Sequence, residues 1–165
     1  MNRAGVLTLS DKGSRGQRED RSGEILKNML SDLGLSIDRY EIIPDEEELI
    51  RDMLISWTDE LCLDLIVTTG GTGLSPRDVT PEATLSVIDK RVYGMEEVMR
   101  SASLEKTPHA MISRAIAGVR KKTLIVNLPG SPSGVKDCME SIAPAITHAI
   151  AKIGGDMSEC APPSR

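Results

Sequence analysis

The chain has 165 residues, of which 39% are hydrophobic and 27% charged, and its formal net charge is −5. These values are typical of a globular domain and exclude a disordered chain. The acidic balance, without a long basic run, argues against a nucleic-acid binder, and no apolar run approaches the roughly 18 residues of a membrane span. We expect one domain over residues 1–156 and a flexible tail over residues 157–165.

The cysteines and histidines do not indicate a metal centre. The three cysteines form no CxxC pair, and the two histidines lack the paired spacing of zinc ligands. The first ten residues also lack the long apolar core of a signal peptide. Together these features predict reduced thiols and a cytoplasmic protein.

The first half of the chain predicts two strand–helix pairs. Short apolar runs over residues 4–9 and 36–43 indicate strands. A helix with an apolar face over residues 25–33 lies between them, and Gly34 supplies its left-handed cap. Apolar residues at helical spacing over residues 49–61 indicate a second helix.

Asp45 lies between the second strand and the second helix, and two roles suit it. With Glu48 it resembles an acidic capping box at the start of the helix, which is a common structural role. A carboxylate that caps a helix can still present its free oxygen to Mg²⁺ through water. The two roles therefore do not exclude each other.

A Gly-rich loop follows the buried apolar strand that we predict over residues 63–67. Glycines allow backbone N–H groups to approach anionic oxygens, so the run Gly70, Gly71, Thr72 and Gly73 suits a phosphate group. The loop has neither the Walker A sequence nor the spacing of a dinucleotide-binding motif. A simple Gly-rich turn is an equally frequent explanation of such a run.

Asp78 lies in the same loop and favours a ligand. A carboxylate repels a phosphate unless a divalent cation lies between them, so Asp78 suggests Mg²⁺ with a nucleotide. The alternative is that Asp78 is a turn residue that hydrogen-bonds its own backbone. Thr80 as N-cap and Pro81 at the first position then predict a helix that runs to about Lys90.

The rest of the chain predicts two further helices and one clear strand. A helix covers residues 95–104, and residues 111–119 suit either a helix or a strand. Residues 123–128 form a strand that ends at Pro129 and Gly130. Ser131 caps the last helix, within which Pro144 predicts a kink or a break.

Alternating strands and helices predict an α/β fold of three layers, with a mostly parallel sheet and helices on both faces. Ligands of such sheets bind beyond the carboxyl ends of the strands. Four predicted strands end in polar or Gly-rich stretches, so one cleft built from all four is the natural inference. The stretches are Ser10–Asp11, Pro44–Asp45, Thr69–Asp78 and Asn127–Ser131.

Taken together, these stretches resemble the molybdopterin adenylyltransferase family of molybdenum cofactor biosynthesis, which includes stand-alone bacterial enzymes and a domain of gephyrin. The resemblance extends from about Gly5 to about Gly155. Its most specific part is the run Thr69-Gly70-Gly71-Thr72-Gly73 continued by Arg77-Asp78-Val79-Thr80-Pro81-Glu82-Ala83-Thr84. Shorter matches are Leu9-Ser10-Asp11, Asp20-Arg21-Ser22-Gly23, Pro44-Asp45-Glu46 and Asn127-Leu128-Pro129-Gly130-Ser131-Pro132.

The resemblance implies a homotrimer that transfers AMP from ATP to the terminal phosphate of molybdopterin and releases pyrophosphate, with Mg²⁺ as cofactor. It implies that Asp45 and Asp78 are required for the reaction and face the metal. The loop of Gly70, Gly71, Thr72 and Gly73 would hold the ligands. Ser10, Asp11, Pro129, Gly130 and Ser131 would line the same pocket. A molybdenum-insertion protein is a candidate partner.

The chemistry of two phosphate-bearing substrates agrees with this set of residues, because it requires positioning, backbone donors and a bridging metal rather than a protein nucleophile. Two other functions remain open. A protein on the same fold could bind molybdopterin without catalysis, although two metal-facing acids favour the enzyme. A scaffold role is the third, and a tungsten pathway is an alternative to a molybdenum pathway.

Overall fold

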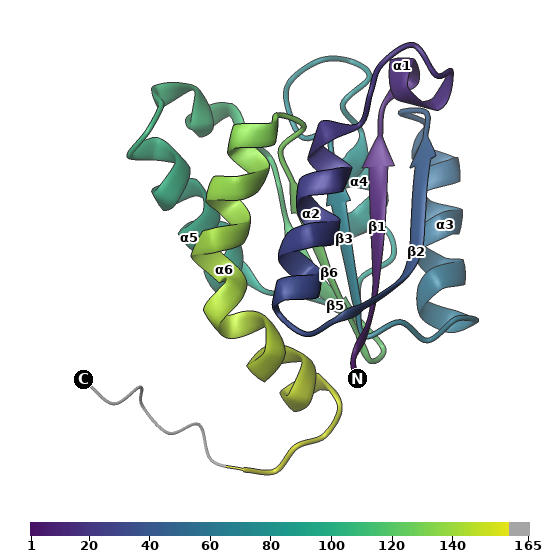
Figure 1. The fold of residues 1–165 in the computed structure, drawn as a ribbon, viewed down its shortest axis with the longest axis vertical. Coiled ribbons are helices and arrows are strands. Elements are labelled where there is room, and N and C mark those ends of the chain that lie inside the picture. Colours follow the sequence, from purple (N-terminus) through teal and green to yellow (C-terminus); the bar gives the residue numbers. More distant parts are fainter. Residues whose placement is uncertain (159–165) are drawn as a thin grey trace.

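The computed structural model describes residues 1–158, which form a six-stranded sheet with helices on both faces (Figure 1). The strands lie in the order β2-β1-β3-β6-β5-β4. Their bounds are β1 Arg3–Leu9, β2 Ser36–Ile43, β3 Leu65–Thr69, β4 Lys90–Arg91, β5 Ala117–Arg120 and β6 Thr123–Leu128. The first four strands in this order run parallel, whereas β5 and β4 add an antiparallel edge. The predicted α/β class with a mostly parallel sheet is confirmed.

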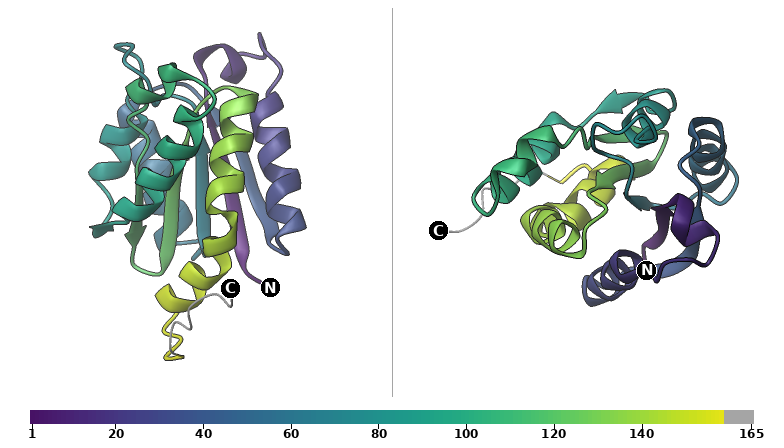
Figure 2. Two further views of the ribbon diagram at one scale, coloured as in Figure 1. Left: turned by 90° about the vertical axis from the view of Figure 1, so that its left-hand side faces the viewer. Right: turned by 90° about the horizontal axis from the view of Figure 1, so that it is seen from above.

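Helices cover the two faces of the sheet unequally (Figure 2). The helices are α1 Asp11–Ser14, α2 Arg21–Asp32, α3 Glu47–Asp59, α4 Thr80–Leu85, α5 Tyr93–Leu104, the 3₁₀ helix η1 Pro108–Ile112 and α6 Pro132–Ile153. One buried cluster joins the sheet to α2, α5 and α6, and a second joins it to α3 and α4. The predicted three layers follow from these two clusters.

Alternating side chains of the central strands divide between the two clusters. In β3, Leu65 and Val67 face the α2–α6 side, while Ile66 faces the α3–α4 side. In β6, Val126 faces the first side and Ile125 the second. Strands that are covered on both faces need apolar residues at every position, which explains the continuous apolar runs of the sequence.

Three local predictions differ from the structure. The predicted helix 81–90 ends at Leu85, because the backbone then turns and Asp89 donates to the Val119 carbonyl beside β4. The ambiguous stretch 111–119 contains the end of η1 and most of β5. Of the kink or break predicted at Pro144, the break is absent, because α6 is one continuous helix with Pro144 on its exposed side.

No helix within the described residues is long and apolar enough to cross a membrane. Of the predicted tail, residues 157 and 158 have neither helix nor strand. Residues 159–165 lie outside the described part of the chain, and the prediction of a flexible tail there stays a prediction.

Candidate functional site

Two adjoining cavities lie at the carboxyl ends of the central parallel strands. The larger has a volume of about 740 Å³ and is lined by Ser10, Asp45 and Gly70, among others. The smaller has a volume of about 380 Å³ and is lined by Thr72, Gly73 and Pro129, among others. Both cavities share Gly71, Asp78, Gly130 and Ser131. The structure therefore brings together every predicted site residue except Asp11.

Asp11 lies beside the larger cavity and supports its neighbours. Its carboxylate accepts from Arg77, at 2.7 Å from Nη2 and 3.0 Å from Nε, and this contact lowers the pKa of Asp11. The same carboxylate accepts from the Asp45 backbone N–H at 3.2 Å, and the Asp11 N–H donates to the Asp45 side chain at 3.0 Å. These reciprocal bonds hold Asp45 against the end of β1.

Asp45 is not the cap of α3, so the capping-box interpretation is wrong. The N-cap position belongs to Glu46, which makes no side-chain cap bond, and the helix begins at Glu47. The carboxylate of Asp45 turns to the Asp11 N–H instead. Burial raises the pKa of Asp45, and the nearby charges of Asp11 and Asp78 raise it further. A cation bound beside Asp45 would stabilise its charged form against burial and against the repulsion of the two neighbouring acids.

Asp78 closes a turn and also lines both cavities. Its Oδ2 accepts from the Ser75 N–H at 2.8 Å, and its own N–H donates to the Ser75 carbonyl at 2.8 Å. The turn role is therefore real. Within residues 1–158, the second oxygen, Oδ1, accepts no hydrogen bond. The turn thus holds a carboxylate that keeps one oxygen for another partner.

At two positions of the glycine loop, the backbone has a conformation that only glycine adopts readily. Gly70 and Gly71 have φ values of +102° and +65°. A Cβ on Gly71 would lie 2.3 Å from Thr80 Oγ1, and a Cβ on Gly70 would lie 2.3 Å from the Leu9 carbonyl oxygen. Both glycines therefore permit a close approach of the loop to its supports.

Three consecutive amide groups of this loop have no acceptor among the described residues. Within the described part of the chain, the N–H groups of Gly71, Thr72 and Gly73 donate no hydrogen bond, although Thr72 is buried. Backbone donors that lack a protein partner are rare in folded proteins and are normally satisfied by water or a ligand. Three of them in succession beside a cavity form a suitable place for anionic oxygens.

Thr80 supports the loop and does not cap α4 as predicted. Its hydroxyl donates to the Gly70 carbonyl at 2.9 Å, and its N–H donates to the Gly71 carbonyl at 3.1 Å. The N-cap position belongs to Val79, which makes no side-chain bond. This use of the hydroxyl is favourable, because the buried Gly70 carbonyl would otherwise lack a hydrogen-bond donor.

The loop after β6 forms the opposite wall of the cavities. The Thr69 hydroxyl donates to the Pro129 carbonyl at 2.7 Å, and the Ser22 hydroxyl donates to the Gly130 carbonyl at 2.8 Å. Ser131 caps α6 as predicted, since its side chain accepts from the Gly134 N–H at 3.2 Å. The wall is thereby tied to β3 and α2.

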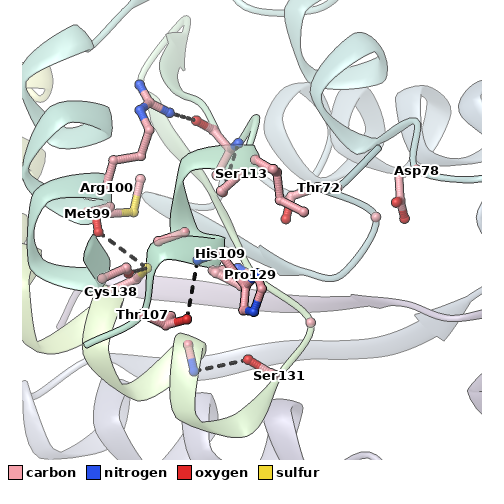
Figure 3. Close-up of a pocket in the computed structure, with 18 of the residues that line it drawn as sticks. Thr72, Asp78, Met99, Arg100, Thr107, His109, Ser113, Pro129, Ser131 and Cys138 are labelled. Carbon is pink, nitrogen blue, oxygen red and sulfur yellow. Dashed lines mark hydrogen bonds between the residues drawn. The ribbon is translucent and has the colours of Figure 1, made fainter. Parts of the chain in front are cut away.

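The smaller cavity extends from the glycine loop towards α5 and η1 (Figure 3). Thr72 and Asp78 lie at one side, and Met99, Arg100 and Cys138 lie at the other. Burial raises the pKa of the Cys138 thiol, which keeps it protonated near neutral pH. Cys138 therefore contributes a buried, protonated thiol to the cavity wall.

Sequence reasoning missed several residues around the cavities. Arg18 and Arg21 line the larger cavity. Arg18 lies in the loop 12–19, which the family motifs do not cover, whereas Arg21 lies in the matching run 20–23, to which we assigned no binding role. Arg100 lines the smaller cavity, and Arg114 contacts the loop that carries Asp78. Arg114 falls in the stretch 111–119, where no local signal distinguishes it from any surface arginine.

The acids of the site fit Mg²⁺. No group of three or more His, Cys, Asp or Glu side chains gathers as a metal site within residues 1–158. Mg²⁺, however, is usually held by one or two carboxylates, with water and substrate phosphates as its other ligands. Asp45 and Asp78, which line one cavity and raise the charge density there, match that donor set.

Residues 5–148 match the family described as "Probable molybdopterin binding domain". The chain belongs to this family. It is 46% identical to the molybdopterin adenylyltransferase of Helicobacter pylori J99 over 92% of this chain and 88% of that protein. It is 45% identical to gephyrin of Dictyostelium discoideum over 97% of this chain, which spans 24% of that longer protein.

A solved structure agrees with the observed fold. The molybdopterin biosynthesis enzyme MoaB from Thermus thermophilus superposes with a TM-score of 0.89 and 47% sequence identity. The match covers 94% of this chain and 98% of that one. The resemblance that the sequence motifs indicated is therefore confirmed at the level of family and fold.

Proposed function

We propose that the chain is a molybdopterin adenylyltransferase, a nucleotidyltransferase that transfers AMP from ATP to the terminal phosphate of molybdopterin and releases pyrophosphate. The observation that carries the proposal is that three unpaired loop amides lie beside Asp78, at the junction of the two cavities, and beside Asp45, on the wall of the larger one. Relatives at 39% to 46% identity that are named for this activity support it.

The two cavities suit a reaction between two bound substrates. Each is large enough for part of a small molecule, and they meet at Gly71, Asp78, Gly130 and Ser131. A phosphate from either side can reach that junction. Holding the attacking phosphate and the α-phosphate there converts an encounter of two anions into a reaction within one complex.

The residues at the junction and on the adjoining cavity walls would perform three tasks. The amides of Gly71, Thr72 and Gly73 would bind phosphate oxygens and orient them. Asp45 and Asp78 would hold Mg²⁺, which when bound supplies positive charge against the phosphates. Arg18 and Arg21 are the cationic side chains among those lining the larger cavity, and they would offset the charge of the triphosphate.

The test is to incubate the purified chain with molybdopterin, Mg²⁺ and ATP labelled at the α-phosphate. We expect pyrophosphate and a labelled, adenylylated molybdopterin in equal amounts, and neither product when Mg²⁺ is replaced by a chelator. Binding of molybdopterin without either product would contradict the proposal and establish a non-catalytic molybdopterin-binding protein. The family resemblance also leads us to propose a homotrimer and a molybdenum-insertion protein as a partner.

A further inference from the structure

The loop from Thr72 to Val79 carries Asp78 but has little support of its own. It contains no helix or strand, and Leu74 to Arg77 are exposed. Its internal bonds are those of the Ser75–Asp78 turn, which fix the turn but not its place in the molecule. If Asp78 is to keep a defined position at the cavity junction, contacts from elsewhere must hold the loop.

Arg114 supplies such contacts at both ends of the loop. Its Nε donates to the Gly73 carbonyl at 2.8 Å, and its Nη2 donates to the carbonyl of Asp78 itself at 2.6 Å. Its backbone N–H donates to the Thr72 carbonyl at 2.9 Å. Its Nη1 forms an ion pair with Glu82 in the first turn of α4. One side chain therefore joins the glycine loop, Asp78 and the helix that follows.

The geometry requires an arginine. The guanidinium group is a rigid planar fork, so fixing one of its donors fixes the directions of the others. A lysine at this position could donate to one or two of the acceptors but could not span Gly73, Asp78 and Glu82 from one plane. Arg77 also holds the loop, because its side chain pairs with Asp11, but it anchors the exposed tip to which it belongs and makes no contact with the carbonyl of Asp78.

We propose that Arg114 is a positioning residue for adenylyl transfer, because it sets the place of Asp78 relative to the glycine loop and Asp45. Arg114 lines neither cavity and contacts no substrate in this scheme. The inference rests on the proposed function for its catalytic consequence. Its structural part, the fixed place of the Asp78 loop, stands independently of the activity.

The first arm of the test is hydrogen exchange in the full chain without substrates. Arg114→Lys should accelerate exchange of the loop amides that the turn protects, at Ser75 and Asp78, by roughly 10-fold or more, because the short turn opens more often once the loop around it is no longer anchored. Exchange in β3 and α6 should not change. Equal loop exchange in the parent and the variant overturns the inference, whether or not the chain has adenylyltransferase activity.

The second arm is kinetic and uses the parent as reference. Arg114→Lys should lower kcat roughly 10- to 100-fold while KM for molybdopterin and ATP stays within about 3-fold, because misplacement of a catalytic group acts on the transition state. A parent that makes no product refutes the proposed function alone. An active parent with an unimpaired Arg114→Lys variant overturns the positioning role.

Arg120→Lys is the matched control. Arg120 also makes three side-chain hydrogen bonds, two to Asp59 at 2.7 and 2.9 Å and one to the Val87 carbonyl at 2.9 Å. It is the last residue of β5 and pairs with Thr123, the first residue of β6, at the end of the sheet opposite to the cavities. Its variant should change neither the loop exchange nor kcat. An equal loss of kcat in both variants would show a general loss of stability and overturn the inference.

A double variant distinguishes action through Asp78 from an independent effect. If Arg114 acts by placing Asp78, the residual rate of Asp78→Asn should not fall further when Arg114→Lys is added. If kcat of the double variant falls by the product of the two single fold-losses, Arg114 acts independently of Asp78, and the inference is overturned. Thermal melts of the parent and the four variants verify that each is folded at the assay temperature.

Discussion

At the scale of single residues, we expect the substitution Asp78→Asn to lower the rate of catalysis strongly. Asp78→Asn removes the charge but retains an oxygen that can accept from the Ser75 N–H, so the turn is preserved. Loss of an electrostatic catalytic group costs about 10²-fold or more in kcat. We expect a loss of that size in pyrophosphate release, with molybdopterin affinity within about 3-fold of the parent because one source of repulsion is also removed.

The control for this prediction is a thermal melt, which should show nearly equal midpoints for Asp78→Asn and the parent. Turnover at the parent rate would mean that Asp78 serves the turn alone. Both roles were foreseen from the sequence, but their coexistence was not. Coexistence depends on Oδ1 remaining without a partner while Oδ2 is bonded, and no sequence pattern specifies that.

Asp45 gives a prediction about pH. Its folded-state pKa is raised above the ordinary value of 3.8, mainly by burial. The folded protein therefore binds the proton of Asp45 more tightly than the unfolded chain does, and stability declines as pH rises from about 3.8 through the raised pKa. Asp45→Asn removes this decline, so the variant should melt at a higher temperature than the parent at pH 7.

The difference in melting temperature should shrink as the pH falls towards 3.8, where the parent carries the proton as well. The same variant should lose activity, since a functional site commonly retains a group that costs stability. Calorimetry at pH 4 and pH 7, in the absence of Mg²⁺, measures the effect. A variant that is less stable at pH 7 would show that the charged form of Asp45 is favoured in the fold.

At the scale of elements, the central parallel strands and the loops that follow them could be predicted because their signals are local. Continuous apolar runs indicated β1, β3 and β6, and polar, Gly-rich or Pro-containing stretches marked their ends. The antiparallel edge could not be predicted. Residues beyond Leu85 have helical patterning, yet pairing with β5 overrides it, and such a long-range contact leaves no trace in a short window.

The glycine loop is supported from below by a buried polar chain, which gives a prediction about stability. Asn127 Nδ2 donates to Thr84 Oγ1 at 3.0 Å, Thr84 Oγ1 donates to the Thr80 carbonyl at 2.9 Å, and Thr80 Oγ1 donates to the Gly70 carbonyl at 2.9 Å. Thr80→Val keeps the shape but leaves the Gly70 carbonyl without its donor. The free energy of unfolding should fall by about 1–3 kcal/mol.

Denaturant unfolding measures this change, and Thr80→Ser is the matched control because it retains the hydroxyl. The serine variant should lose less stability than the valine variant. If the Thr80→Val variant is as stable as the parent, the hydrogen bond to Gly70 does not hold the loop. The result also bears on the site, because a displaced Gly70 would move the unpaired amides of the next three residues.

At the scale of the whole molecule, we expect a homotrimer with a mass of about 54 kDa, three times the 17.9 kDa of the chain. Closed symmetric oligomers are the usual form of homo-oligomers. The structure adds a candidate surface. Tyr93, Val98 and Leu104 of α5 are exposed, as are Met111 and Ile112 of the adjacent η1, and burial of such side chains would favour association.

Light scattering at micromolar concentration tests the assembly, and Met111→Asp tests the surface. If the trimer forms through α5 and η1, a charge at this exposed position must be desolvated on association, so the variant should dissociate at concentrations at which the parent is trimeric. Leu49→Asp is the control, since Leu49 is a partly exposed leucine on α3, on the other face of the sheet. A monomeric parent would contradict the trimer itself. A trimeric Met111→Asp variant would place the interface on another surface. The smaller cavity, which η1 borders, would then stay open to solvent in the trimer.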